Sequence, residues 1–237
     1  MGSKCFGPPP LPQIEPAILP PISKSENKEI NKQLENYICK IHCAGDQFGT
    51  GFFCNILYPN NSNSNDLQLL PVLITNNHVL NKNDTQKNKE ISLSFNENKI
   101  SKKLIITPDR RTYNNEKYDV TIIEIFPDKD DIHHFLNLNE NILNDKGDEY
   151  DKKTIYILQY PNPGLSSFSL GKLYYYYEYN IIHNCGTEVG SSGGPIMLLD
   201  TMKVIGMHKR KDKDNNQFNF GTLLKYPLSQ LNNNTFK

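Results

Sequence analysis

From Tyr37 onward, short apolar runs alternate with polar turns. The runs have the length of strands and are rich in β-branched and aromatic residues, and no 3.6-residue periodicity connects them. This pattern predicts an all-β fold, a sandwich or barrel, rather than an alternating α/β fold. The candidate strands are residues 37–45, 49–57, 68–77, 90–96, 102–109, 119–126, 153–161, 171–183, 194–200, 203–209 and 219–226.

A polar stretch from Asp128 to about Lys153 divides these runs into two groups. The division favours two barrels packed against each other, and the alternative is a single large sandwich. We expect one folded domain over residues 36–237. Its first barrel would span about residues 37–135 and its second about residues 150–230.

Residues 1–35 differ in composition from the rest of the chain. They are too rich in proline for a helix or a central strand, so we expect an extended, disordered tail. A short helical or coil entry around residues 27–37 would lead into the folded domain. The sequence "PPPLP" could present a polyproline helix to an SH3- or WW-type partner, and the alternative is a plain spacer.

The first residues also suggest lipid attachment. Gly2 and Cys5 are placed for myristoylation with nearby palmitoylation, and two lipids together would anchor the chain to a membrane. Phe6 departs from this pattern, which has Ser or Thr at that position. The alternative is that this start carries no signal.

Charge and cysteine content narrow the function classes. Lys plus Arg and Asp plus Glu number 26 each, so no net charge draws the chain toward nucleic acid. The odd number of cysteines, without a signal peptide or a long apolar run, predicts a reducing, cytoplasmic location and no secretion. Cys39, His42 and Cys43 are poorly spaced for zinc, and we expect no metal or cofactor.

The stretch "TEVGSSGGPIML", residues 187–198, raises the question of a nucleophilic serine. A serine hydroxyl needs a base to take its proton and a third group to orient that base. His78, at the end of an apolar strand, and Asp119, directly before another, are candidates. Taken singly, each has an ordinary structural explanation: a strand end, a turn and a glycine-rich loop.

In combination they resemble the chymotrypsin-fold serine peptidases. The order His78, Asp119, Ser192 is that of the family, and "GSSGGP" matches its Gly-x-Ser-Gly-Gly-Pro motif. "TNNHV" is similar to the histidine segment of the HtrA/Deg and glutamyl-endopeptidase branches. "GTGFF", residues 49–53, resembles the hairpin before that segment. The resemblance covers about residues 37–230 and implies two six-stranded β-barrels with the site in the cleft between them.

The resemblance also implies roles. Ser192 would attack the substrate carbonyl, His78 would take its proton, and Asp119 would orient the imidazole. The backbone amides of Gly190 and Ser192 would form the oxyanion hole. Ser191 stands where trypsin-branch relatives have the Asp that receives a new N-terminal amine, so we do not expect that mode of activation.

Thr187 and His208 correspond to pocket residues in glutamyl endopeptidases and in viral relatives that cut after glutamine. The resemblance therefore implies cleavage of protein or peptide substrates after Glu or Gln, whose side chains a hydroxyl and an imidazole can hydrogen-bond. The alternative is that His208 simply ends a strand and points to solvent. The rival function is a catalytically silent, peptide-binding scaffold recruited through the N-terminal tail. An esterase is disfavoured because its α/β nucleophile elbow is missing.

Overall fold

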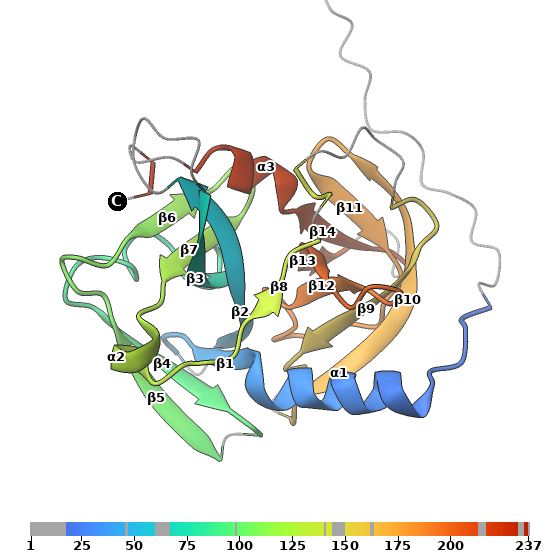
Figure 1. Ribbon diagram of the computed structural model, residues 1–237, viewed down its shortest axis with the longest axis horizontal. Coiled ribbons are helices and arrows are strands. Elements are labelled where there is room, and N and C mark those ends of the chain that lie inside the picture. Colours follow the sequence, from blue (N-terminus) through green and yellow to red (C-terminus); the bar gives the residue numbers. More distant parts are fainter. Residues whose placement is uncertain are drawn as a thin grey trace, which may run out of the picture.

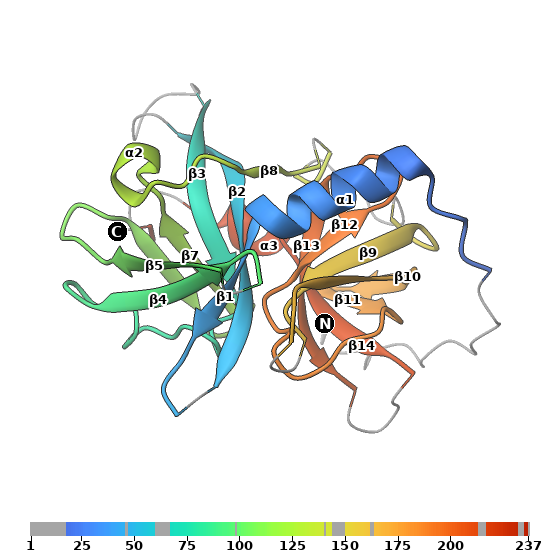
Figure 2. The same cartoon turned by 90° about the horizontal axis from the view of Figure 1, so that it is seen from below.

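The computed structural model has two β-structures side by side, with one long helix that runs along the second and ends against the first (Figures 1 and 2). No helix in the described part of the chain is long and apolar enough to cross a membrane. Gly2, Cys5 and the "PPPLP" segment lie outside the described residues, so lipid attachment and SH3 or WW docking stay predictions. The structure describes residues 18–45, 47–59, 67–97, 99–139, 141–143, 150–161, 164–212, 217–231 and 235–236.

Among these residues, the first half of the chain forms an eight-stranded sheet. Its order is β5-β4-β1-β2-β3-β7-β6, antiparallel throughout, with β8 parallel to β2. The strands are β1 (Ile38–His42), β2 (Phe48–Pro59), β3 (Leu67–Thr75), β4 (Glu90–Phe95), β5 (Ile100–Ile105), β6 (Thr112–Asn115), β7 (Val120–Glu124) and β8 (Leu136–Asn137).

The second half of the described chain is a closed six-stranded barrel in the order β10-β11-β14-β13-β12-β9. The all-β, chymotrypsin-like architecture predicted from the sequence is therefore confirmed, although strand pairing closes only the second barrel among the described residues; we call the eight-stranded sheet the first barrel. The strands are β9 (Thr154–Gln159), β10 (Ser167–Tyr177), β11 (Asn180–His183), β12 (Pro195–Leu198), β13 (Val204–Lys211) and β14 (Asn219–Leu223). The helices are α1 (Lys24–Asn36), α2 (Pro127–Asp130) and α3 (Lys225–Ser229).

One expected strand is a hairpin. Residues 171–183 form β10 and β11, which turn at Glu178, where φ is 51°. The run of tyrosines hides this turn because no glycine or proline marks it. The short strands β6 and β8 were also not predicted, since each has few apolar residues.

Part of the extended tail expected over residues 1–35 is helical, because α1 begins at Lys24. Ser23 and Glu26 form a reciprocal capping box at its start. Ile30 and Leu34 lie one turn apart and are buried, and the Tyr156 hydroxyl of β9 donates a 2.8 Å hydrogen bond to Gln33 Oε1. The prediction of a disordered chain up to residue 35 is thus wrong for this helix, because its short apolar stripe packs on the barrels.

The strands that meet between the barrels are buried on both faces. On β2, Phe53 points into the first barrel, while Phe52 belongs to a cluster shared with the second. On β9, Ile157 points into the second barrel and Tyr156 into the same shared cluster. Burial on both faces explains why these strands read as continuous apolar runs rather than as alternating ones. The shared cluster fixes the barrels against each other.

Arg110 closes part of the first barrel. Its guanidinium makes two hydrogen bonds to Asp130 of α2, at 2.8 and 2.7 Å. It also donates to the carbonyl oxygens of Ile105, at the end of β5, and of Glu124, at the end of β7. These contacts join the edge strand β5 to β7 and α2. The side chains are 2% and 9% exposed, so the pair is desolvated.

We predict that Asp130→Asn destabilises the fold by about 3 kcal/mol, since it leaves a buried guanidinium without its counter-charge. Urea unfolding followed by circular dichroism measures this. The control is Glu90→Gln, which breaks the exposed pair between Glu90 and Lys103 and is expected to lose less than about 1 kcal/mol. Equal losses in the two variants would contradict a structural role for the Arg110 contacts.

Candidate active site

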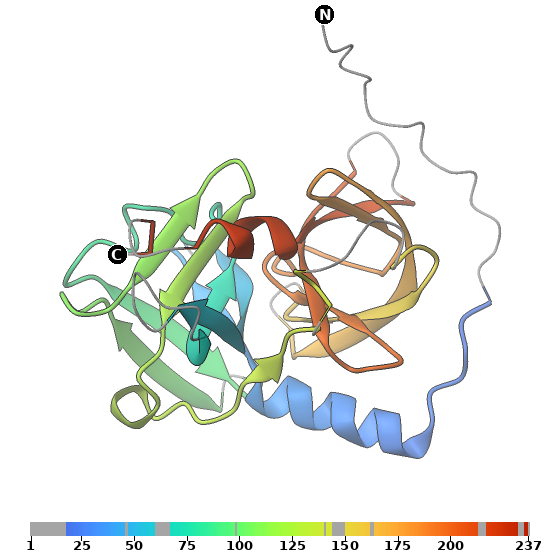
Figure 3. The same ribbon diagram turned by 45° about the horizontal axis from the view of Figure 1, so that its top comes forward.

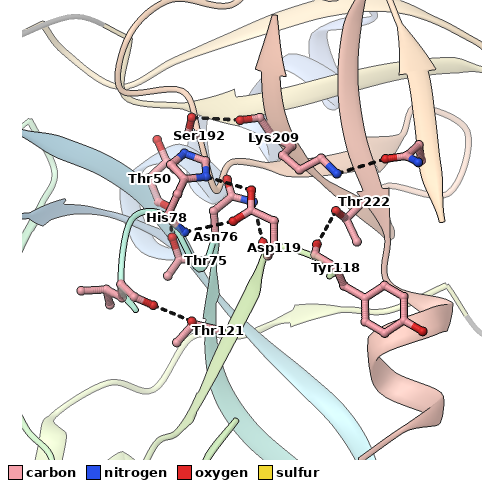
Figure 4. A network of polar contacts seen from close by, with 12 residues as sticks. Thr50, Thr75, Asn76, His78, Tyr118, Asp119, Thr121, Ser192, Lys209 and Thr222 are labelled. Carbon is pink, nitrogen blue, oxygen red and sulfur yellow. Dashed lines mark hydrogen bonds and ion pairs between the residues drawn. The ribbon is translucent and has the colours of Figure 1, made fainter. Parts of the chain in front are cut away.

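His78 and Asp119 form a two-point hydrogen-bonded pair (Figure 4). His78 Nδ1 lies 2.8 Å from Asp119 Oδ2, and the His78 backbone N–H donates to Asp119 Oδ1 at 2.9 Å. A carboxylate can only accept, so the ring proton is on Nδ1 and Nε2 of the neutral imidazole is free to accept. The side chains are 48% and 18% exposed, so the imidazole is open to a ligand while the carboxylate is sheltered.

Strand pairing delivers the two residues to one place. β3 and β7 are antiparallel neighbours, with Thr75 opposite Thr121. The chain leaves β3 at Thr75 and turns tightly, with the carbonyl oxygen of Asn76 accepting from two amides at the end of the turn. His78 emerges from this turn, and Asp119 directly precedes β7. Their 41-residue separation in sequence thus becomes a direct contact.

Asp119 has a left-handed backbone, with φ of 52°, a conformation that Asp tolerates better than most residues. Asn76 Nδ2 donates to its carbonyl oxygen at 2.9 Å. The preceding carbonyl, that of Tyr118, accepts a 2.8 Å hydrogen bond from the Thr222 hydroxyl of the second barrel. Contacts from both barrels therefore hold the carboxylate toward the imidazole.

Ser192 lies in the loop between β11 and β12, against the segment after β3 that carries His78 (Figure 4). A Cβ on Gly193 would lie 2.5 Å from the Thr75 hydroxyl, and one on Gly49 would meet both Val79 and the Ser192 carbonyl oxygen. Only glycines allow this close approach. The Ser192 hydroxyl donates to the Lys209 carbonyl oxygen at 3.1 Å, so in this structure it is not directed at the imidazole.

In the loop around Ser192, the amides of Gly190 and Ser192 are among those without a hydrogen-bond partner in the described structure. The amides of Ser191, Gly193 and Gly194 donate to carbonyl oxygens within the second barrel. The amides of Gly190 and Ser192, the pair expected for the oxyanion hole, do not. Gly190 and Gly193 have φ near +90°, which glycine adopts readily. The arrangement can bind an anionic oxygen.

Ser191 has a structural role in this loop. Its hydroxyl accepts from the Glu188 N–H at 2.9 Å, and its own N–H donates to the Glu188 carbonyl oxygen at 3.1 Å. The fully buried side chain therefore closes the turn that precedes Ser192. This position, read from the sequence as a missing aspartate, stabilises the loop through a neutral side chain.

Thr50 of β2 holds the same loop from the first barrel. Its hydroxyl donates to the Gly190 carbonyl oxygen at 2.8 Å and accepts from the Tyr160 N–H at 3.0 Å. Its backbone N–H donates to the Ser192 carbonyl oxygen at 2.8 Å. With both carbonyls fixed, the peptide groups around the unpartnered amides have little freedom to turn.

Thr187 and His208 belong to one hydrogen-bonded network inside the second barrel. Thr187 donates to Asn219 Oδ1 at 2.9 Å, and Asn219 Nδ2 donates to the Cys185 carbonyl oxygen at 2.8 Å. The Cys185 N–H donates to His183 Nδ1 at 3.2 Å, and His183 Nε2 lies 3.3 Å from His208 Nδ1. His208 is buried, contrary to the alternative that it points to solvent.

These contacts fix the protons on both rings. Because the Cys185 N–H occupies Nδ1 of His183, the proton of neutral His183 is on Nε2, which donates to His208 Nδ1. Neutral His208 then carries its own proton on Nε2. Burial lowers the pKa of His183 and is the main cause of the lowered pKa of His208. Both rings are therefore uncharged at neutral pH.

Three residues of the site, Thr50, His183 and Asn219, were not identified as site residues from the sequence. "GTGFF" contains Thr50, but only as part of a hairpin motif. His183 and Asn219 were counted only as strand residues.

Among the described residues, no three His, Cys, Asp or Glu side chains gather in a way that could hold a metal ion. His42 instead lies 2.6 Å from the Ser94 hydroxyl through its Nε2.

Comparison with solved structures gives the same architecture. The Rv3671c protease from M. tuberculosis, in its active form, aligns with a TM-score of 0.59 and 16% identity, over 91% of this chain and 93% of that one. Deg5 aligns with a TM-score of 0.59 and 14% identity, over 87% of this chain and 92% of that one. A serine endoprotease from Yersinia pestis aligns with a TM-score of 0.60 and 10% identity, over 88% of this chain and 66% of that one. At these identities the likeness shows the fold alone.

No curated protein sequence matches the chain significantly. The family model of the trypsin-like peptidase domain matches residues 49–207. This match runs from the hairpin that contains Thr50, through His78 and Asp119, to the strand after Ser192. Since it covers more than half of the sequence, the chain belongs to the family of trypsin-like peptidases.

Proposed function

We propose that this peptidase is a serine endopeptidase with the triad Ser192, His78 and Asp119. The observation that carries the proposal is the His78–Asp119 pair, which lies beside the serine loop (Figure 4), where the amides of Gly190 and Ser192 have no partner in the described structure. No cofactor is required for this chemistry. A peptide-binding scaffold is not favoured, because peptide binding needs neither an oriented imidazole nor an oxyanion hole.

In the first step the Ser192 hydroxyl turns from the Lys209 carbonyl oxygen toward His78. Nε2 takes the hydroxyl proton as Oγ attacks the substrate carbonyl, whose oxygen becomes an anion held by the amides of Gly190 and Ser192. The imidazolium gives this proton to the leaving amine, and an acyl-enzyme remains. Water then attacks the ester and passes a proton to His78, and release of the acid restores Ser192.

A cavity of about 350 Å³ adjoins His78 on the side of the β1–β2 hairpin, and His42, Gln47 and Asp84 are among its lining residues. Since His78 protonates the leaving amine, the chain after the scissile bond leaves past this cavity. Room for substrate on that side suits cleavage within a chain, as an endopeptidase requires.

The network around His208 favours glutamine over glutamate before the scissile bond. Neutral His208 has one N–H to give, on Nε2, and the Thr187 hydroxyl has given its proton to Asn219 and can still accept. One donor and one acceptor complement a carboxamide, which offers one of each. A carboxylate would be buried beside uncharged rings and would leave the threonine without a proton donor.

We predict that Ser192→Ala abolishes labelling by a fluorophosphonate, because the reagent reacts only with an activated serine. Asp119→Asn is expected to slow labelling by about 10³-fold or more, since it destabilises the imidazole tautomer that accepts the serine proton. Ser101→Ala, at an exposed position of the edge strand β5, serves as the control and is expected to keep Ser192 labelled. The assignment fails if the parent is not labelled, or if Ser192→Ala is labelled equally.

Thr50→Val tests the support of the oxyanion hole. It keeps the shape but leaves the Gly190 carbonyl and the Tyr160 amide unpaired, so we expect kcat to fall about 10- to 100-fold with little change in KM. Steady-state hydrolysis of a fluorogenic peptide measures both constants. Thr50→Ser retains the hydroxyl and should recover most of kcat. Equal kcat for the Val and Ser variants would show that the hydroxyl does not act on the loop.

Peptides that differ only in Gln or Glu before the scissile bond test the pocket. We expect kcat/KM to favour Gln by about tenfold or more, since a buried unpaired charge is costly. Thr187→Val should reduce kcat/KM for the Gln peptide about tenfold while fluorophosphonate labelling continues, and Thr187→Ser should restore it. A preference for Glu, or for Arg, Lys or Leu, would contradict the assignment of His208 and Thr187.

A further inference from the structure

Lys209 places a partly buried ammonium group close to the catalytic pair. Its Nζ donates to Asn180 Oδ1 at 3.0 Å and lies 5.3 Å from the centre of the Tyr179 ring, on the β10–β11 hairpin. Burial lowers the pKa of this lysine, and the negative charge of Asp119 partly offsets the effect. Figure 4 shows the side chain leading away from Ser192, past Thr222.

Lys117 brings a second ammonium group to the same ring. Its Nζ lies 5.5 Å from the centre of the Tyr118 ring and 5.9 Å from that of Tyr179. The two rings pack edge to face, with centres 5.1 Å apart. We call Lys117, Tyr179 and Lys209 the lysine corner. Two cations thus meet at one aromatic ring, one from each barrel.

In the described structure, the carboxylate of Asp119 acts on Lys209 by its charge but is hydrogen-bonded to His78, so it does not form an ion pair with the lysine corner. Neither lysine forms an ion pair there, although Glu116 and Glu178 are close in sequence to the corner and exposed. Aromatic rings and a neutral amide compensate only part of the hydration that a partly buried ammonium loses. A carboxylate brought by a ligand would supply the missing charge.

A substrate held at Ser192 reaches this corner. β12 pairs with β13 only as far as Met207, and Gly193 and Gly194 pair with His208, so the edge of β13 that a peptide can use begins at Lys209. The Lys209 carbonyl oxygen already receives the Ser192 hydroxyl on that edge. An extended peptide can add to such an edge as a further strand, with alternate side chains on either face. The corner lies away from the leaving-group cavity, which adjoins His78 on the side of the β1–β2 hairpin.

We propose that the lysine corner is a subsite for an acidic side chain of the substrate, two to four residues before the scissile bond. The inference rests on the proposed endopeptidase function. It adds a charged recognition element to the uncharged glutamine site at His208. A preferred substrate would then carry Asp or Glu shortly before a glutamine.

Binding to the Ser192→Ala protein tests the subsite without catalysis. The probes are fluorescein-labelled nonapeptides with Gln before the scissile bond and Glu at one of the three preceding positions, each with a twin that has Gln there. Fluorescence anisotropy is expected to show about tenfold tighter binding of the Glu peptide at one position, because charge-assisted hydrogen bonds are stronger than neutral ones. The difference should shrink as NaCl is raised.

Lys117→Met and Lys209→Met, each in the Ser192→Ala protein, are expected to reduce the Glu-to-Gln ratio toward one. Lys117 is exposed, so its variant keeps the fold even if Lys209→Met does not. Lys28→Met, on the exposed face of α1, removes the same charge elsewhere and should leave the ratio unchanged. Equal affinity of the twins at every position, absence of binding, or a ratio unaffected by both lysine variants would overturn the proposal. If the Glu peptide binds more tightly but the parent protein is not labelled by the fluorophosphonate, the subsite is supported and the endopeptidase function is rejected.

Discussion

The contact of Thr50 with the serine loop is the constraint on which the site depends. One residue of the first barrel binds the carbonyl groups of both Gly190 and Ser192. The amides of Ser191 and Gly193, at the other ends of those two peptide groups, donate inside the second barrel, and the amides of Gly190 and Ser192 have no partner in the described structure. Gly193 makes the contact possible, since a Cβ there would lie 1.9 Å from the Thr50 carbonyl oxygen.

This constraint works only if the barrels keep their relative position, which the shared cluster around Phe52 and Tyr156 provides. Helix α1 contacts β1 of the first barrel and β9 and β10 of the second, and Figure 3 shows it along their lower side, with α3 crossing above. The histidine and the aspartate come from one barrel and the serine from the other. The packing between the barrels therefore sets the geometry of the candidate site.

Much of the fold was predictable because local patterns carry it. Strand-length apolar runs gave most strands, and the order of His78, Asp119 and Ser192 within known motifs gave the family, which the domain match confirms. The turn at Glu178 was missed because no glycine or proline marks it. Helix α1 was only half expected because its stripe of apolar residues is short, and it depends on contact with β9.

The parts of the site that could not be predicted depend on contacts between distant segments. The hydroxyl of Thr50 meets a carbonyl 140 residues later, and His183 meets His208 across the barrel interior. Neither contact has a sequence signature. The proposed preference for glutamine over glutamate depends on which ring nitrogen of His183 carries a proton. That is set by the Cys185 backbone amide, so no list of side chains reveals it.

A crystal structure of the protein after reaction with a fluorophosphonate tests the central claim most directly. The account predicts phosphorus bonded to Ser192 Oγ, with the phosphoryl oxygen about 2.7–3.1 Å from the amide nitrogens of both Gly190 and Ser192. The Thr50 hydroxyl should still contact the Gly190 carbonyl oxygen. Phosphorus on another residue, or a phosphoryl oxygen that points away from those amides, would contradict it.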